Sequence, residues 1–158
     1  MKKKTIGNKI MVVMMTLMLL LTGLGASKNV FAAANTADVA WSYNLNVSSK
    51  KTHYISRREK LNKSNAYVNW NGVYGGNLSK IAVSPYKATT SSSSLKNAGT
   101  ETGGSRTYIM NGCGKYEVKI YVKSPYKFAS IGLKAYAGKG TAKGVWSPDC
   151  AGNYKVLQ

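Results

Sequence analysis

Acidic residues are scarce in this sequence of 158 residues, which contains only five Asp and Glu against 23 Lys and Arg. The acids are widely separated along the chain: Asp38, Glu59, Glu101, Glu117 and Asp149. A glycoside hydrolase needs two carboxylates that face each other across a cleft, and this spacing offers no such pair. The shortage therefore argues against carboxylate catalysis, and it leaves a formal net charge of +18.

Histidine and cysteine are almost as rare. His53 is the only imidazole, so any Ser-His or Cys-His nucleophilic pair would have to use it. It lies in a basic segment, and no serine lies in a nucleophile-elbow pattern, so we interpret it as a surface histidine. One imidazole and two thiols are too few ligands for a closed zinc site. We therefore expect no metal, no other cofactor and no enzymatic activity.

The sequence has no apolar run long enough to cross a membrane. The run from Ile10 to Leu21 has 12 residues, whereas a membrane-spanning helix needs about 20. Lysines precede it and small residues follow it, which is the pattern of a secretory signal peptide. We predict a helical signal peptide in residues 1–34, with cleavage after Ala34 or after Ala32, and an uncleaved anchor as the alternative. The product, residues 35–158, is expected to be secreted or cell-wall associated.

Export determines how the two cysteines are interpreted. Cys113 and Cys150 both lie in the exported part, and an even number of cysteines in an oxidising compartment favours a disulfide. Closing a loop of this length would stabilise the fold by about 4 kcal/mol in the chain-entropy model. The sequence therefore predicts a disulfide between Cys113 and Cys150.

Hydrophobic periodicity in residues 35–158 predicts strands. Apolar and polar residues alternate from Trp41 to Val47 and from Tyr116 to Val122, as in half-buried strands. Weaker stretches of the same kind cover residues 66–70, 78–83, 106–110, 128–137 and 143–146. Short strands at this spacing predict one all-β domain, a small antiparallel β-sandwich, with a small β-barrel as the alternative. We expect the core to contain Trp41, Trp70, Val118, Ile120 and Trp146.

Two other segments show no alternation of apolar and polar residues. Residues 48–62 contain enough helix-forming residues for a short helix and could equally form a long loop. Residues 89–104 are rich in Ser and Gly with almost nothing to bury, and they predict an exposed loop.

A short sequence echo lies on either side of that loop. Asn-Gly followed by a strand and Ser-Pro-Tyr-Lys occurs first at residues 71–87 and again at residues 111–127. It indicates two related β units, each with a hairpin turn at Asn-Gly and a strand end at Ser-Pro-Tyr-Lys, with chance in a Ser-, Lys- and Tyr-rich sequence as the alternative. Tyr86 and Tyr126, at the two strand ends, are expected to be exposed.

The positive charge belongs to the exported part. Removal of residues 1–34 lowers the net charge only from +18 to +13, because that segment holds five of the Lys and Arg and no acid. Such a surface attracts anionic polymers or membranes in a salt-dependent way, although charge can also serve solubility alone. The candidate binding residues are the densest basic run and the echoed Tyr-Lys pairs: Lys50, Lys51, Arg57, Arg58, Lys60, Lys63, Tyr86, Lys87, Tyr126 and Lys127.

The chain resembles an uncharacterised family of small exported β-rich proteins from Gram-positive bacteria. The resemblance rests on the end of the signal segment, residues 31–34, and on the carboxy-terminal pattern Gly-Val-Trp-Ser-Pro-Asp at residues 144–149. It implies a secreted β-rich fold and no known activity.

We therefore expect a secreted, cationic, non-enzymatic protein that associates with an anionic cell-wall polymer or membrane surface. The alternative is a bacteriocin-like antimicrobial protein that acts on membranes, although such proteins usually present an amphipathic basic helix. Nucleic acid is not an expected partner, because no recognition fold is visible in the sequence.

Overall fold

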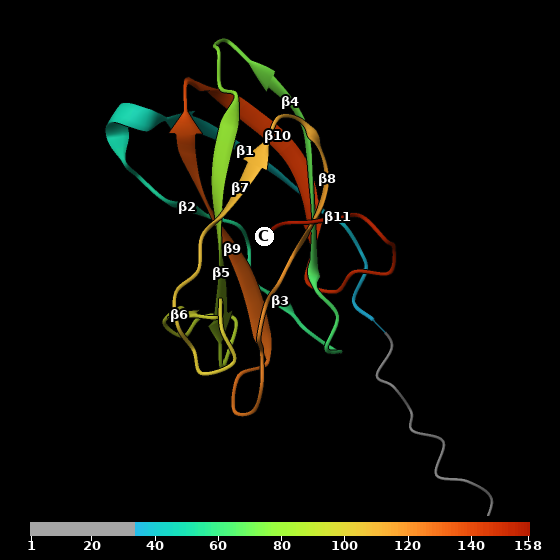
Figure 1. Cartoon of the computed structure of the whole chain (residues 1–158). Coiled ribbons are helices and arrows are strands. Elements are labelled where there is room, and N and C mark those ends of the chain that lie inside the picture. The colour runs from blue at the N-terminus through green and yellow to red at the C-terminus, as the bar shows by residue number, and fades with distance from the viewer. Residues whose placement is uncertain (1–33) are drawn as a thin grey trace, which may run out of the picture. The chain divides into compact units, whose positions relative to one another are not determined.

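A computed structural model describes residues 34–158 (Figure 1). The predicted signal-peptide helix therefore lies outside the described residues. One sheet contains, in spatial order, β1 (Val39–Asn46), β10 (Lys139–Ser147), β4 (Ala66–Tyr74), β8 (Gly114–Val118) and β11 (Lys155–Val156). In the other sheet, β9 (Phe128–Ala137) pairs with β5 (Lys80–Ala88). Short strands complete its edges: β2 (His53–Tyr54) and β3 (Arg58–Glu59) on β9, and β7 (Tyr108–Asn111) and β6 (Lys96–Asn97) on β5.

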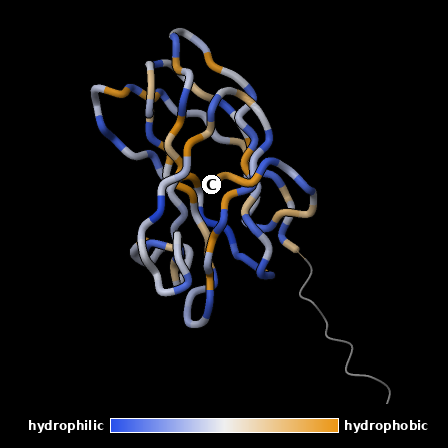
Figure 2. The backbone as a smooth tube through the Cα atoms, viewed as in Figure 1, coloured by the Kyte–Doolittle hydropathy of each residue, from blue (hydrophilic) through white to orange (hydrophobic). Residues whose placement is uncertain are grey.

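The predicted all-β sandwich is confirmed. The strands within each sheet are antiparallel except for the pairing of β11 with β8, and in residues 34–158 the two sheets keep separate strand orders instead of closing into the alternative barrel. The hydrophobic residues concentrate in the middle of the fold (Figure 2). All five predicted core residues are buried, each with at most 5% of its surface exposed. Their burial follows from the strand alternation, which turns every second side chain inward.

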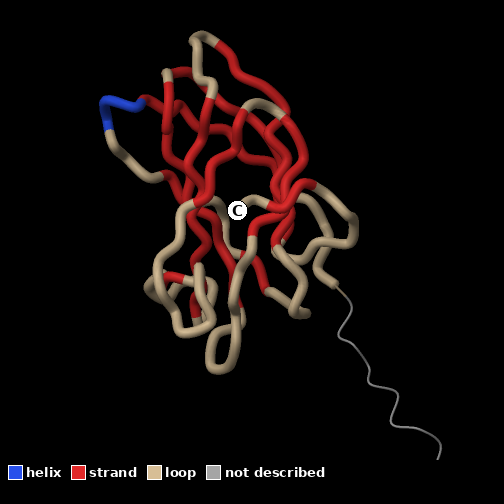
Figure 3. The backbone as a smooth tube through the Cα atoms, viewed as in Figure 1, coloured by secondary structure: helices blue, strands red, loops and turns tan. Residues whose placement is uncertain are grey.

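Residues 48–62 form neither the predicted helix nor a plain loop. A single 3₁₀ turn, η1 (Val47–Ser49), is the only helical element in the described part of the chain (Figure 3). After it the chain runs extended along β9, where the Ile55 amide donates to the Ile131 carbonyl at 2.9 Å and the Lys60 amide to the Lys127 carbonyl at 2.8 Å. Ile55 is buried, and it has no apolar partner three or four residues away, so no helix face could form.

The sequence echo is not a structural repeat. The first Asn-Gly lies inside β4, at a register shift opposite Lys143, and the second lies in the connection between β7 and β8, which belong to different sheets. The first Ser-Pro-Tyr-Lys lies within β5, whereas the second lies in the turn before β9. The predicted hairpin turns are therefore absent from residues 71–72 and 111–112. Pro85 is tolerated in β5 because its edge neighbours β7 and β6 leave a gap there.

The loop predicted at residues 89–104 is exposed over most of its length, as expected, but it is anchored at one point. Lys96–Asn97 form β6, and the next residue, Ala98, is fully buried and donates its amide to the Pro85 carbonyl at 3.0 Å. The loop is therefore held against the end of β5.

The predicted disulfide is wrong, because Cys113 and Cys150 are free thiols. They lie beside the same sheet, at different positions along its strands. Cys113 precedes Gly114, which pairs with Trp70 on β4. The Cys150 amide instead donates to the Ser64 hydroxyl, just before β4 begins, at 3.0 Å. Trp70 and the start of β4 are four residues apart, a span of about 13 Å in a strand, whereas a disulfide requires Cα atoms within about 7 Å.

Thiol alkylation tests this arrangement. A protein that comprises residues 35–158, denatured without reductant, is expected to take up two iodoacetamide groups. In the native protein Cys113 should react first, since it is exposed, whereas burial raises the pKa of the Cys150 thiol. Cys113→Ser should remove the fast reaction and Cys150→Ser should leave it. Absence of alkylation in denaturant until a reductant is added would instead establish a disulfide.

Candidate anion-binding pocket

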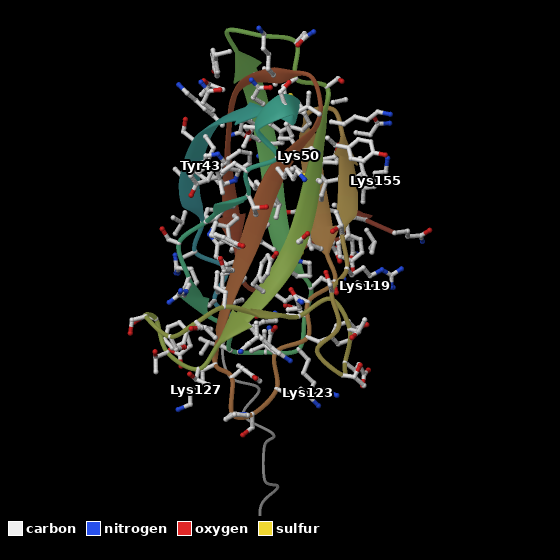
Figure 4. The ribbon with its side chains drawn as sticks, turned by 90° about the vertical axis from the view of Figure 1, so that its left-hand side faces the viewer. Tyr43, Lys50, Lys119, Lys123, Lys127 and Lys155 are labelled. Carbon is white, nitrogen blue, oxygen red and sulfur yellow. The ribbon has the colours of Figure 1, made fainter. Side chains whose placement is uncertain are left out.

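The structure separates the predicted surface residues instead of joining them in one patch. Lys50 and Lys51 are exposed after η1, and Figure 4 places Lys50 at one end of the fold and Lys127 at the other. Lys63 and Lys127 are exposed, whereas Tyr86 and Tyr126 are half-buried and not exposed as predicted. The half-buried tyrosines pack their rings against neighbouring side chains, Tyr86 against Tyr54 and Tyr126 beneath the Lys87 ammonium.

Three of the predicted cations bind the protein's own backbone and side chains. The Arg57 guanidinium donates to the Ser91 carbonyl at 2.6 Å. Arg58 donates to the side-chain oxygen of Asn35 at 2.8 Å. The Lys60 side chain is only 2% exposed, so it does not present its ammonium to a surface ligand.

Lys60 forms a buried ion pair with Asp149, whose side chain is fully buried. The Lys60 ammonium donates to the Asp149 carboxylate at 2.8 Å and to the backbone carbonyls of Ser64 and Pro148 at 2.6 and 2.7 Å. The other carboxylate oxygen accepts the amides of Leu61 at 3.0 Å and Asn35 at 2.7 Å. Burial lowers the pKa of Lys60, and the bond and charge of Asp149 oppose that shift.

Most of the Lys87 side chain is buried, but its ammonium reaches solvent. The residue is 8% exposed, and the ammonium lies 4.6 Å from the centre of the Tyr126 ring. Within residues 34–158 this ammonium has no hydrogen-bond acceptor and no carboxylate at ion-pair distance, and it is not one of the buried unpaired polar atoms, which are the indole nitrogens of Trp41 and Trp146. A cation over an aromatic face is stabilised by about 0.5–2 kcal/mol.

The Lys87 ammonium lines a pocket of about 490 Å³. Strand pairing explains its charge, because Lys87 on β5 lies directly opposite Lys96 on β6, and like charges in that position repel each other. Lys123 adds a third ammonium, and Glu101, the one acid in the lining, already pairs with Lys123 at 3.0 Å. Three lysines thus line the pocket with one carboxylate. The hydroxyls of Thr102 and Ser124 complete the polar lining.

The echoed Tyr-Lys pairs predicted part of this pocket. The Lys127 amide donates to the Ala88 carbonyl at 3.0 Å, which holds the second pair beside the first and places Tyr126 under Lys87. The sequence did not identify Lys96 and Lys123 as candidates, because nothing in their local pattern indicates that the loop folds back on β5. Figure 4 shows Lys123 and Lys127 at the same end of the fold. An adjacent hollow of about 510 Å³ is lined by Lys63 and again by Lys123.

A second hollow, of about 480 Å³, lies over the outer face of β5 and β9. Lys50 and Tyr86 line it together with Lys134 and Tyr136, and its floor includes Gly132. A Cβ atom at Gly132 would lie 2.8 Å from the Tyr86 ring, so glycine allows that ring to lie flat on the sheet. The tyrosine therefore covers a gap in the sheet surface, and the hollow has no buried unpaired charge.

His53 stands apart from the Lys87 pocket. Its ring lies 5.0 Å from the ring of Tyr43, and burial together with Lys51 lowers the pKa of the imidazole. In residues 34–158 no three His, Cys, Asp or Glu side chains lie close enough to hold a metal ion. No helix in this part of the chain is both long and apolar enough to span a membrane.

Comparison with known proteins gives one match. A family model described as a protein of unknown function, DUF2712, matches residues 28–150. No curated protein and no solved structure matches the chain.

Replacement of Lys60 tests the buried ion pair. Lys60→Met removes one partner and leaves the Asp149 carboxylate buried without its cation, so we expect a loss of about 3–5 kcal/mol in the free energy of unfolding. Urea denaturation measures this loss. The matched control is Lys123→Met, because the Lys123–Glu101 pair has side chains 63% and 67% exposed and should contribute less than about 1 kcal/mol. Equal losses in the two variants would contradict a special role for the buried pair.

Proposed function

The chain belongs to the DUF2712 family, whose function is unknown, and from its charge and the Lys87 pocket we propose that it is a secreted, non-enzymatic protein that binds an anionic polymer of the cell envelope. The ligand chemistry we propose is a chain of phosphodiesters, as in a teichoic acid. The pocket at the end of β5 takes one phosphate group, and the surrounding lysines contact its neighbours along the polymer.

The observation that carries the proposal is a pocket lined by three lysines and one acid, Glu101, which already pairs with Lys123. The Lys87 ammonium in this pocket has no carboxylate of the described chain at ion-pair distance. An anionic oxygen between Lys87, Lys96 and Lys123 would supply the missing charge. Lysine acts on phosphate as a point charge with rotatable donors, which suits a flexible polymer better than a ligand of one fixed geometry.

The overall charge supports the same partner. A net charge of +13 on residues 35–158 attracts a polyanion over a distance and raises the association rate, and salt weakens both effects. Lys63 and Lys127 are exposed at the pocket end of the fold and extend the positive surface beyond the pocket. A polymer that follows this surface contacts several cations at once.

Two variants with the same charge change test the proposal. The exported protein is titrated with purified teichoic acid at low salt, and Lys87→Gln should weaken binding at least about tenfold, the effect of losing one charge-assisted hydrogen bond. Lys139→Gln is the control, because Lys139 is exposed at the β9–β10 turn, away from the pocket, and should change binding far less. Equal effects would show a diffuse charge attraction only, and no binding at low salt would overturn the proposal.

Anionic lipid vesicles replace the polymer in a parallel titration, and preference for vesicles would favour the membrane-directed alternative.

The same pocket predicts a gain of stability in a variant that binds less well. Lys87→Met removes the repulsion between Lys87 and Lys96, which lie directly opposite each other, and keeps the buried methylene stem, so the urea midpoint of the free protein should increase. Teichoic acid should stabilise the original protein more than this variant. A structural lysine would give the reverse result, a lower midpoint in the Lys87→Met protein.

A further inference from the structure

The first residues of the described chain are held in place by specific bonds. Asn35 uses all of its polar groups except the backbone carbonyl: its amide donates to Asp149 at 2.7 Å, its side-chain nitrogen donates to the Glu59 carbonyl at 2.7 Å, and its side-chain oxygen accepts from Arg58 at 2.8 Å. Asn35 is half-buried, whereas Ala34, one residue earlier, is exposed. The protein therefore recognises position 35 and not position 34.

The acceptor of the Asn35 amide is a fully buried carboxylate. Asp149 receives Lys60 on one oxygen and the amides of Leu61 and Asn35 on the other. In a chain that continues toward the amino terminus, the Asn35 nitrogen is a neutral amide. In a chain that begins at Asn35, the same nitrogen is a primary amine that is protonated near neutral pH.

We propose that the chain is cut between Ala34 and Asn35 and that the new α-ammonium of Asn35 forms an ion pair with the buried carboxylate of Asp149. A signal peptidase adds one water across the peptide bond, which leaves a carboxylate on Ala34 and an amine on Asn35 that takes up a proton. The 2.7 Å hydrogen bond to the Asp149 carboxylate, in which only the acceptor is charged, becomes an ion pair in which the donor is charged as well. Removal of the predicted signal peptide thus adds a second cation to the groups that contact the buried Asp149 carboxylate.

The geometry distinguishes the two cleavage positions that the sequence allows. Cleavage after Ala32 would place the ammonium at Ala33, two residues before Asn35 in the sequence, and would leave Asn35 with its neutral amide against Asp149. The groups around the Asn35 nitrogen include two cations, Lys60 and Arg58, so the ammonium is stabilised only through its direct contact with Asp149. That contact is available to the first residue alone.

The experiment begins with the exported protein. Its intact mass should correspond to a chain that starts at Asn35, and a chain that starts at Ala33 would overturn the proposal. Two forms are then compared, one that begins at Asn35 and one that begins at Ala33, each released from a fusion by a protease that leaves no extra residue. The form that begins at Asn35 should have the higher urea midpoint.

Labelling of the α-amine gives a readout that does not depend on a folding-sensitive variant. In the native protein that begins at Asn35, an amine-reactive reagent at pH 7 should label the terminus about tenfold more slowly than in denaturant, the ratio expected of one charge-assisted bond. The terminus of the form that begins at Ala33 should show no such protection. Equal labelling rates in the two native forms would overturn the ion pair. Asp149→Asn, where it folds, should remove the difference between their urea midpoints.

Discussion

The buried carboxylate of Asp149 is the contact on which the ends of this sandwich depend. A carboxylate with no exposed surface is tolerable only if it is fully bonded, and here one ammonium and two backbone amides satisfy it. These donors come from the segment before β1 and from the segment that follows β3, while the acid itself follows β10. One side chain therefore joins three segments that lie outside the strands, and the family match, which ends at residue 150, includes all of them.

Two lysine side chains in residues 34–158, Lys60 and Lys87, are largely buried, and their surroundings are opposite. Lys60 has an acid and two carbonyls within 2.8 Å, so its charge is compensated inside the fold. Lys87 has only the face of Tyr126, and its ammonium opens into a pocket with two more lysines. Burial alone would have ranked the two residues together. Their bonding separates them, since the Lys60 ammonium is satisfied inside the fold whereas the Lys87 ammonium has no anion of the described chain and lies at a pocket.

The strands and the aromatic core could be predicted from sequence because alternation is a local property, and Trp41, Trp70 and Trp146 are buried as expected. Local alternation could not decide three other features: the disulfide, the helix at residues 48–62 and the surface role of Lys60. Each depends on which distant segment lies alongside: the register on β4 separates the cysteines, β9 draws residues 53–59 into extended pairing, and Asp149, far along the chain, turns Lys60 inward. The echoed Tyr-Lys pairs did identify Lys87 and Tyr126 of the pocket, but these two residues are neighbours in space and not equivalent positions of a repeated unit.

The scarcity of acids then acquires a structural reason. Asp149 is buried with Lys60, and Glu117 accepts Asn65 and the amide of Tyr154, so it holds the last residues of the chain against β8. Glu101 pairs with Lys123 at the rim of the pocket. Asp149 and Glu117 thus serve as internal acceptors and Glu101 is already paired, so few acids remain to neutralise the exposed lysines. The outward field of the protein is positive because 23 Lys and Arg face only five acids, and the Lys87 ammonium has no carboxylate of residues 34–158 at ion-pair distance.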